Sequence, residues 1–188
     1  MCAMYPPPAM SSDDRQQRFA ASVLPHLDAA YNLARWLVRD ANDAQDVVQD
    51  AMLRALRHFD GLRGVDPRPW LLAIVRNAAW AWLKSRRPAE LVALSDDELD
   101  AALSPDAPDM NPESLAIRRT ERLAIDAAIA ALPIAFRETL ILRELEELSY
   151  REIAQVLEVP IGTVMSRLSR ARALLARALR PTEAGVSE

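Results

Sequence analysis

Residues 148–175 read LSYREIAQVLEVPIGTVMSRLSRARALL, and this stretch decides the fold of the C-terminal half of the chain. Ser149 and Glu152 form the S-x-x-E pattern of a capping box, which predicts that a helix begins at Tyr150. Glu158–Pro160 leaves room only for a tight turn. The next helix repeats apolar residues at helical spacing, namely Val164, Leu168, Ala171 and Leu175. The pattern predicts a helix-turn-helix.

The opposite face of the second helix is predicted to be small, polar and basic. Its residues are Thr163, Ser166, Arg167 and Arg170. Arginine binds guanine edges or phosphates, while serine and threonine allow close approach to DNA. No acidic residue occurs from Val159 through Arg180, whereas a face shaped only for solubility mixes both signs. The stripe is therefore a candidate DNA contact, and a plain helical hairpin with a solvated face is the alternative.

Composition narrows the possible classes of protein. The chain has 188 residues, 51% of them hydrophobic and 27% charged, which fits one domain or two small ones and excludes a wholly disordered chain. No apolar run approaches the ~18 residues that span a bilayer, and Met1–Pro8 lacks a secretion signal, so we expect a cytoplasmic protein without membrane insertion. A single cysteine, Cys2, and the isolated His26 and His58 predict no disulfide, metal site or cofactor.

The formal net charge of −4 is distributed unevenly. Residues 89–116 contain many acids and no lysine or arginine. A basic block precedes them, formed by Arg76, Lys84, Arg86 and Arg87. A second basic block lies near the C-terminus, formed by Arg167, Arg170, Arg172, Arg177 and Arg180. Two basic patches around an acidic segment predict two lobes that face nucleic acid, although solvated helix ends would give the same pattern.

The N-terminal half has the periodicity of three amphipathic helices. An apolar stripe from about Arg15 to Arg39 predicts the first, with Pro25 as a kink or short break. Asp43 is placed to cap a second helix. Gly61–Pro69 is predicted to be a loop, and the third helix carries its apolar face from Trp70 to Leu83.

An acidic stretch separates the two helical parts. Residues 88–110 hold prolines and acids without apolar periodicity, which predicts a flexible linker. Asn111-Pro112-Glu113 predicts the start of a helix that stops before Pro133. We therefore expect an all-α fold of two small domains. Its predicted parts are a leader (1–14), an N-terminal helical domain (15–87), the acidic linker (88–110), a C-terminal helix-turn-helix domain (111–180) and a tail (181–188).

Several of these stretches resemble the extracytoplasmic-function sigma factors of bacterial RNA polymerase. DANDAQDVVQDAMLRAL (Asp40–Leu56) is similar to the family's acidic, polymerase-binding helix, and WLLAIVRNAAWAWL (Trp70–Leu83) to its promoter-melting helix. NPESLAI (Asn111–Ile117) and LPIAFRETLILRELEELSYREIAQVLEVPIGTVMSRLSRAR (Leu132–Arg172) are similar to its second domain. The resemblance implies a non-enzymatic sigma factor for a specialised stress or envelope regulon, which binds core RNA polymerase, recognises and melts promoter DNA, and is controlled by an anti-sigma factor.

The resemblance also implies roles for particular residues. The contacts to core polymerase would come from Asp46, Gln49, Asp50 and Leu53. Those to the minus-ten element would come from Arg76, Asn77, Trp80 and Lys84. The minus-thirty-five element would be read by Thr163, Ser166, Arg167 and Arg170. Trp80 is either a stacking platform for unpaired bases or an exposed aromatic at the edge of its lobe.

Two other classes of function stay open at this point. A stand-alone helix-turn-helix regulator would use the same DNA contacts but predicts a dimerisation element or ligand pocket. An enzyme has little support, because the sequence lacks a glycine-rich phosphate loop, a Ser-His-Asp set and metal-ligand spacing. The chain also departs from the family pattern: Leu62–Pro69 holds no aromatic residue, and Met165 replaces a basic residue. Glu158 stands where many such turns have glycine, which predicts a turn without a left-handed residue.

Overall fold

The computed structural model describes residues 12–62, 66–88 and 116–180, and within these ranges every regular element is a helix. The N-terminal lobe contains α1 (Ser12–Val23), α2 (Leu27–Val38), α3 (Ala41–His58) and α4 (Pro67–Arg86). The C-terminal lobe contains α6 (Ala116–Ala131), α7 (Ile134–Glu144), α8 (Tyr150–Leu157) and α9 (Ile161–Ala178). The expected all-α fold is confirmed, whereas the Asn111 helix start, the tail and nearly all of the leader and linker lie outside the described residues.

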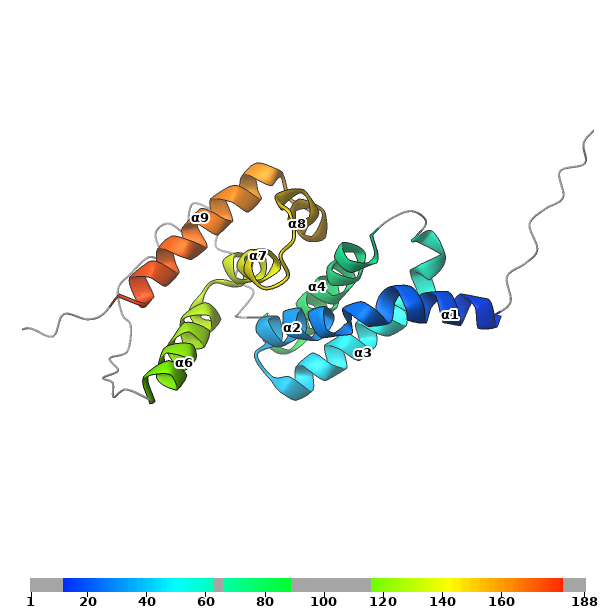
Figure 1. Cartoon of the computed structure of the whole chain (residues 1–188), viewed down its shortest axis with the longest axis horizontal. Coiled ribbons are helices and arrows are strands. Elements are labelled where there is room, and N and C mark those ends of the chain that lie inside the picture. Colours follow the sequence, from blue (N-terminus) through cyan, green and yellow to red (C-terminus); the bar gives the residue numbers. More distant parts are fainter. Residues whose placement is uncertain (1–11, 63–65, 89–115, 181–188) are drawn as a thin grey trace, which may run out of the picture.

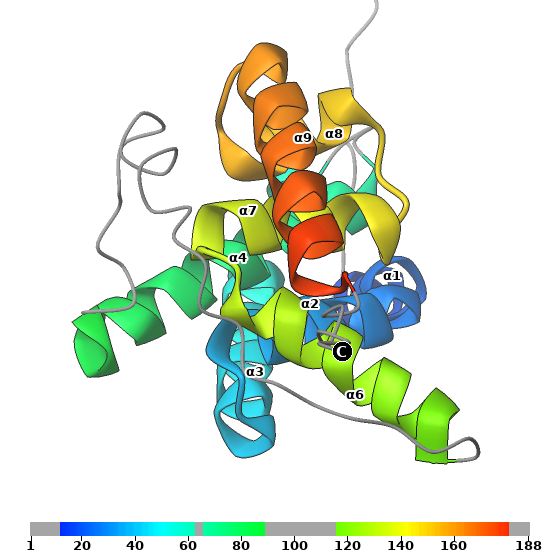
Figure 2. The same ribbon diagram turned by 90° about the vertical axis from the view of Figure 1, so that its left-hand side faces the viewer.

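The two lobes pack against each other through α7 and α8. Helices α2, α3 and α4 contact one another in the N-terminal lobe, and α7, α8 and α9 do so in the C-terminal lobe. Between the lobes, α7 contacts α2 and α8 contacts α4, so that α7 lies between α9 and the N-terminal helices (Figures 1 and 2). Among the described helices, none is both long and apolar enough to cross a membrane.

The core of the N-terminal lobe follows the predicted helical spacing. Its buried side chains include Leu33 and Leu37 on α2, Val47 and Ala51 on α3, and Leu71, Val75 and Leu83 on α4. Small buried residues such as Ala51 allow the helices to approach closely. Burial of each large aliphatic side chain stabilises the lobe by ~1.5–3 kcal/mol. This lobe therefore has a core of its own.

The starts of α1 and α3 differ from the prediction, whereas the break at Pro25 agrees with it. Helix α1 begins at Ser12, before the expected boundary at Arg15, with two aspartates in its first turn that complement the helix dipole. Pro25 does mark a short break, a 3-10 turn over Leu24–His26. The cap of α3 is Asp40 rather than Asp43, because Asp40 Oδ1 accepts the N–H groups of Asn42 and Asp43 at 2.8 and 3.0 Å. These two bonds hold the pKa of Asp40 below its usual value.

The predicted loop Gly61–Pro69 is too long at its C-terminal end. Helix α4 already begins at Pro67, and Asp66 caps it by accepting the backbone N–H of Arg68 at 3.0 Å. Proline is tolerated in the first turn because the N–H groups there have no partner within the helix. Pro67 and Pro69 therefore start the helix rather than delay it.

The helix-turn-helix forms as predicted. Ser149 and Glu152 make the reciprocal capping box, with the Ser149 N–H donating to Glu152 Oε2 at 2.7 Å and the Glu152 N–H to Ser149 Oγ at 3.3 Å. The two helices face each other with buried side chains, which are Ile153, Val156 and Leu157 on α8 and Val164, Leu168 and Ala171 on α9. The turn between them contains Glu158 in the left-handed conformation, with φ 55° and ψ 42°, so the expected turn without such a residue is wrong.

We expect Glu158→Gly to stabilise the fold by about 1 kcal/mol, because glycine has no Cβ to strain the left-handed backbone at the C-terminus of α8. The measurement is equilibrium denaturation in urea at neutral pH. Glu158→Ala is the matched control, since it removes the same charge but keeps the Cβ. Equal stability of the glycine and alanine variants would contradict the prediction.

We expect Ser149→Ala to destabilise the protein by about 1 kcal/mol at neutral pH, because it removes the N-cap of α8. The Ser149 hydroxyl and N–H lower the pKa of Glu152 from its usual 4.5. Because the pKa of Glu152 is lower in the folded state than in the unfolded state, its ionisation stabilises the fold at pH values above the unfolded-state pKa. This contribution is lost as the pH falls through the folded-state pKa. The difference in free energy of unfolding between the wild type and the variant should therefore narrow below about pH 4.5. Denaturation midpoints at pH 7 and pH 3.5 test this, and a constant gap would contradict it.

Candidate nucleic-acid interface

The four candidate polymerase contacts form one exposed row on α3. Asp46, Gln49, Asp50 and Leu53 all lie on the solvent side, opposite the buried Val47 and Ala51. Leu53 is 50% exposed and adds apolar surface to the end of the row. Asp50 pairs with Arg54 at 2.6 Å, one turn further along the same helix. The row is acidic with an apolar end, as a protein-binding surface would be.

The four candidate minus-ten contacts on α4 divide into two pairs. Asn77 and Lys84 are exposed, whereas Arg76 and Trp80 are half-buried. The Arg76 guanidinium lies 4.7 Å from the centre of the Trp80 ring, and Arg76 Nη1 donates to Asn77 Oδ1 at 3.2 Å. Trp80 is thus neither an open platform nor an exposed edge residue in this arrangement. It packs at the junction of the lobes.

The candidate minus-thirty-five stripe lies on the flank of α9 rather than opposite its buried face. Thr163, Ser166, Arg167 and Arg170 are all half-buried, while Gly162, Met165 and Ser169 are exposed. The Ser166 hydroxyl donates to the Thr163 carbonyl at 3.0 Å, within the helix. Because an α-helix turns by about 100° per residue, these four residues lie beside the exposed face of α9 and not on it. The sequence prediction had placed them on the face opposite the buried one. Met165 and Ser169 are the accessible positions that sequence reasoning did not select.

Helix α9 is braced on the rest of the C-terminal lobe. Arg172 donates to Glu144 Oε1 at 2.7 Å, and this bond raises the pKa of Arg172 above its usual value. The Arg143 guanidinium lies 5.3 Å from the Tyr150 ring centre and donates to the Leu148 carbonyl at 2.8 Å. These contacts fix α8 and α9 to α7. A DNA-reading helix needs such rigid support, because base contacts depend on sub-ångström placement.

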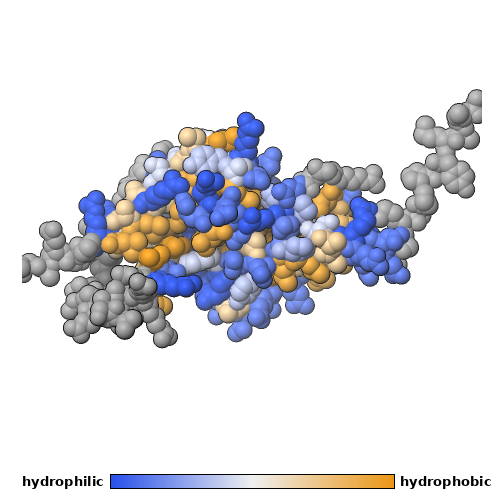
Figure 3. Space-filling model, in the orientation of Figure 1, coloured by the Kyte–Doolittle hydropathy of each residue, from blue (hydrophilic) through white to orange (hydrophobic). Residues whose placement is uncertain are grey.

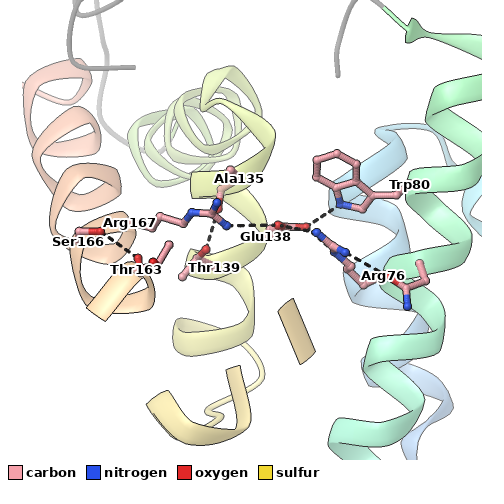
Figure 4. Close-up of polar contacts among 9 residues, drawn as sticks. Arg76, Trp80, Ala135, Glu138, Thr139, Thr163, Ser166 and Arg167 are labelled. Carbon is pink, nitrogen blue, oxygen red and sulfur yellow. Dashed lines mark hydrogen bonds and ion pairs between the residues drawn. The ribbon is translucent and has the colours of Figure 1, made fainter. Parts of the chain in front are cut away.

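A buried glutamate of α7 meets candidate DNA contacts from both lobes. Glu138 is completely buried and accepts Trp80 Nε1–H at 2.7 Å and Arg76 Nε–H at 3.1 Å (Figure 4). On its other side, Arg167 Nη1 lies 3.9 Å from Glu138 Oε1. Sequence reasoning missed Glu138. The signal was the adjacent charged pair Arg137–Glu138 in the first half of α7, whose other charged residues, Arg143 and Glu144, lie at its C-terminal end.

The two helical lobes, one ending in a braced helix-turn-helix, place the chain among helical DNA-binding proteins. Residues 23–88 match the family described as Sigma-70 region 2, and residues 122–175 match the one described as Sigma-70, region 4. The RNA polymerase sigma-H factor of Pseudomonas aeruginosa is 35% identical over 173 residues, which cover 88% of each chain. The ECF RNA polymerase sigma-E factor of Escherichia coli K12 is 35% identical over 148 residues, or 75% of this chain and 76% of that one.

Solved structures of sigma factors share the fold. The sigma factor RpoE of Bartonella quintana, in complex with the anti-sigma factor NepR, has a TM-score of 0.63 at 26% identity, covering 89% of this chain and 97% of that one. CnrH, in complex with the cytosolic domain of CnrY, has a TM-score of 0.56 at 25% identity, covering 88% of this chain and 87% of that one.

The chain belongs to the extracytoplasmic-function sigma factors of the sigma-70 family. It is therefore a transcription initiation factor and not an enzyme, and the stand-alone regulator is not favoured. As a sigma factor it binds core RNA polymerase and promoter DNA, in the interior of a bacterial cell.

Proposed function

We propose that the two lobes divide the work of initiation. The N-terminal lobe binds core polymerase through the exposed α3 row and the minus-ten element through α4. The C-terminal lobe binds the minus-thirty-five element through α9. The observation that carries this proposal is the separation of surfaces: the acidic, partly apolar row lies on α3, and the polar, basic stripe lies on the braced helix of the other lobe.

On α4, the chemistry suits the capture of unpaired bases. Trp80 offers a ring for stacking, Asn77 an amide for a base edge, and Arg76 and Lys84 positive charge for the backbone. On α9, Arg170 is the strongest candidate for bidentate contact with guanine. We add Ser169 to the stripe of Thr163, Ser166, Arg167 and Arg170, because it is exposed next to Arg170.

We further propose cytoplasmic location, a specialised stress or envelope regulon, and control by an anti-sigma factor. The neighbour RpoE is seen bound to an anti-sigma factor, NepR. Apolar side chains gather over the C-terminal part of α9 in Figure 3. Exposed apolar residues of this lobe include Leu123 and Ile125 on α6 and Leu179, which directly follows α9. Such side chains suit a protein partner better than water or DNA.

The test is gel filtration of the purified protein with bacterial core RNA polymerase, followed by run-off transcription on fragments of its own genome. Co-elution with new start sites supports the proposal and gives the promoter sequence. A protein that shifts duplex DNA without binding the polymerase would contradict it.

A further inference from the structure

Two large apolar side chains are exposed next to each other at the start of α9. Ile161 is 42% exposed and Met165 is 54% exposed. They are four residues apart in the same helix, so their side chains lie on one face, about 40° apart around the helix axis. Single exposed apolar residues are common on protein surfaces, but an adjacent pair on a helix proposed to read DNA indicates a contact surface.

The pair forms one edge of the exposed face of α9. The half-buried Arg170 lies at the other edge, about 140° from Met165 around the helix axis. The exposed residues between these edges are small, namely Gly162 and Ser169. A Cβ added at Gly162 would meet nothing within 4 Å. The face is therefore open to the close approach of another surface, with an apolar edge on one side and a cationic edge on the other.

The charges around the pair favour duplex DNA as its partner. Helix α9 holds four arginines and no acidic residue between Ile161 and Ala178. A partner that approaches this face must match positive charge, which the phosphates of a duplex do. The major groove is wide enough for an α-helix, and the apolar group that the four bases display there is the C5-methyl of thymine. The chemistry of the pair therefore fits thymine better than any other base.

Met165 is the member of the pair better suited to touch a base. Its unbranched side chain is longer than that of Ile161, and its flexible thioether adapts to irregular apolar surfaces. Met165 also stands where the family pattern has a basic residue. A methionine can neither pair with a phosphate nor donate to guanine, as a basic residue does. The exchange therefore replaces a charge contact with an apolar one, and this property belongs to the present chain.

We propose that Met165, flanked by Ile161, selects thymine at one position of the minus-thirty-five element by packing against its C5-methyl group in the major groove. The proposal rests on the proposed function, in which α9 reads this element. Arg170 binds a base or a phosphate at the opposite edge of the same face. The two edges of the helix thus recognise different chemical groups of the element.

Deoxyuridine tests this contact, because it pairs as thymidine does and lacks only the C5-methyl group. The complex of the full chain with core polymerase is titrated with a promoter duplex mapped by run-off transcription. In a series of duplexes, each thymine of the minus-thirty-five element is replaced singly by deoxyuridine. At the position that Met165 contacts, the replacement should weaken binding about four-fold, which corresponds to ~0.8 kcal/mol for one buried apolar carbon. This titration needs only the wild-type protein.

Variants then assign the preference to the apolar pair. Met165→Leu keeps an apolar side chain and should keep the four-fold preference for thymine over deoxyuridine, whereas Met165→Gln, of similar length but polar, should abolish it. Ile161→Thr, which keeps the branch at Cβ, should reduce the preference in part. Leu179→Ala is the matched control, because it removes an exposed apolar side chain just beyond the other end of α9 and should leave the preference unchanged. Circular dichroism checks that each variant is folded.

Three results would overturn the thymine contact: a minus-thirty-five element without thymine on either strand, equal affinity for every deoxyuridine duplex, or a preference that Met165→Gln retains. Weaker co-elution of Met165→Gln with polymerase, with the preference retained, would assign the pair to a protein partner instead. The failure of the proposed function looks different, because Arg170→Ala would then leave promoter binding intact as well. If Arg170→Ala weakens promoter binding while deoxyuridine has no effect, only the thymine contact is wrong.

Discussion

The double variant Asp46→Lys, Asp50→Lys should bind core RNA polymerase at least about thirty-fold more weakly than the wild type, since loss of desolvated charge partners at an interface costs ~2–5 kcal/mol. Both carboxylates lie on the exposed row of α3, so the substitutions leave its buried face untouched. The ion pair between Asp50 and Arg54 is lost, but exposed pairs of this kind contribute little to folding. The effect should therefore appear in binding and not in stability.

The matched control is Asp13→Lys, Asp28→Lys, which makes the same change of net charge at exposed positions of α1 and α2. Polymerase affinity is measured by fluorescence anisotropy of the labelled full chain. A loss of similar size in the control would mean that only the overall charge matters. Unchanged affinity in the α3 variant would remove the row from the polymerase interface.

Local sequence signals predicted most of the helices correctly. The capping box at Ser149 and the apolar period of α9 depend on residues within a few positions of each other, so the sequence contains all the information they need. The errors at helix starts have local causes too. Asp40 and Asp43 are both suitable caps, and only the backbone geometry shows which oxygen accepts the bonds. Pro67 was assigned to a loop although proline also suits a first turn.

The junction of the lobes could not be predicted in the same way. Glu138 is separated from Arg76 by 62 residues and meets it only because α7 packs between the lobes. Periodicity assigns a residue to the face of its own helix but does not say what covers that face. Helical spacing therefore indicated the solvent exposure of Asp46, Gln49, Asp50 and Leu53, but it could not indicate the half-buried state of Trp80 and Arg167.

Arg170→Ala should weaken promoter binding by about 10–100-fold, which corresponds to the ~1–3 kcal/mol of a bidentate contact with a base. Arg170 is a cleaner probe than Arg167, because removing Arg167 also takes a cation from beside Glu138. Both lie on the same flank of α9, so the loss of either should spare polymerase binding. The measurement is affinity of the sigma–polymerase complex for its mapped promoter, with polymerase co-elution recorded in parallel.

The pattern of loss identifies the kind of contact that Arg170 makes. A base contact predicts that discrimination relaxes at one base pair of the minus-thirty-five element, whereas a phosphate contact predicts an even loss on all sequences and a salt slope reduced by about one. Arg177→Ala, at the far end of α9, is the control with the same change of charge. If Arg170→Ala reduced polymerase binding and left promoter discrimination intact, α9 would belong to the polymerase interface and the division of work between the lobes would be wrong.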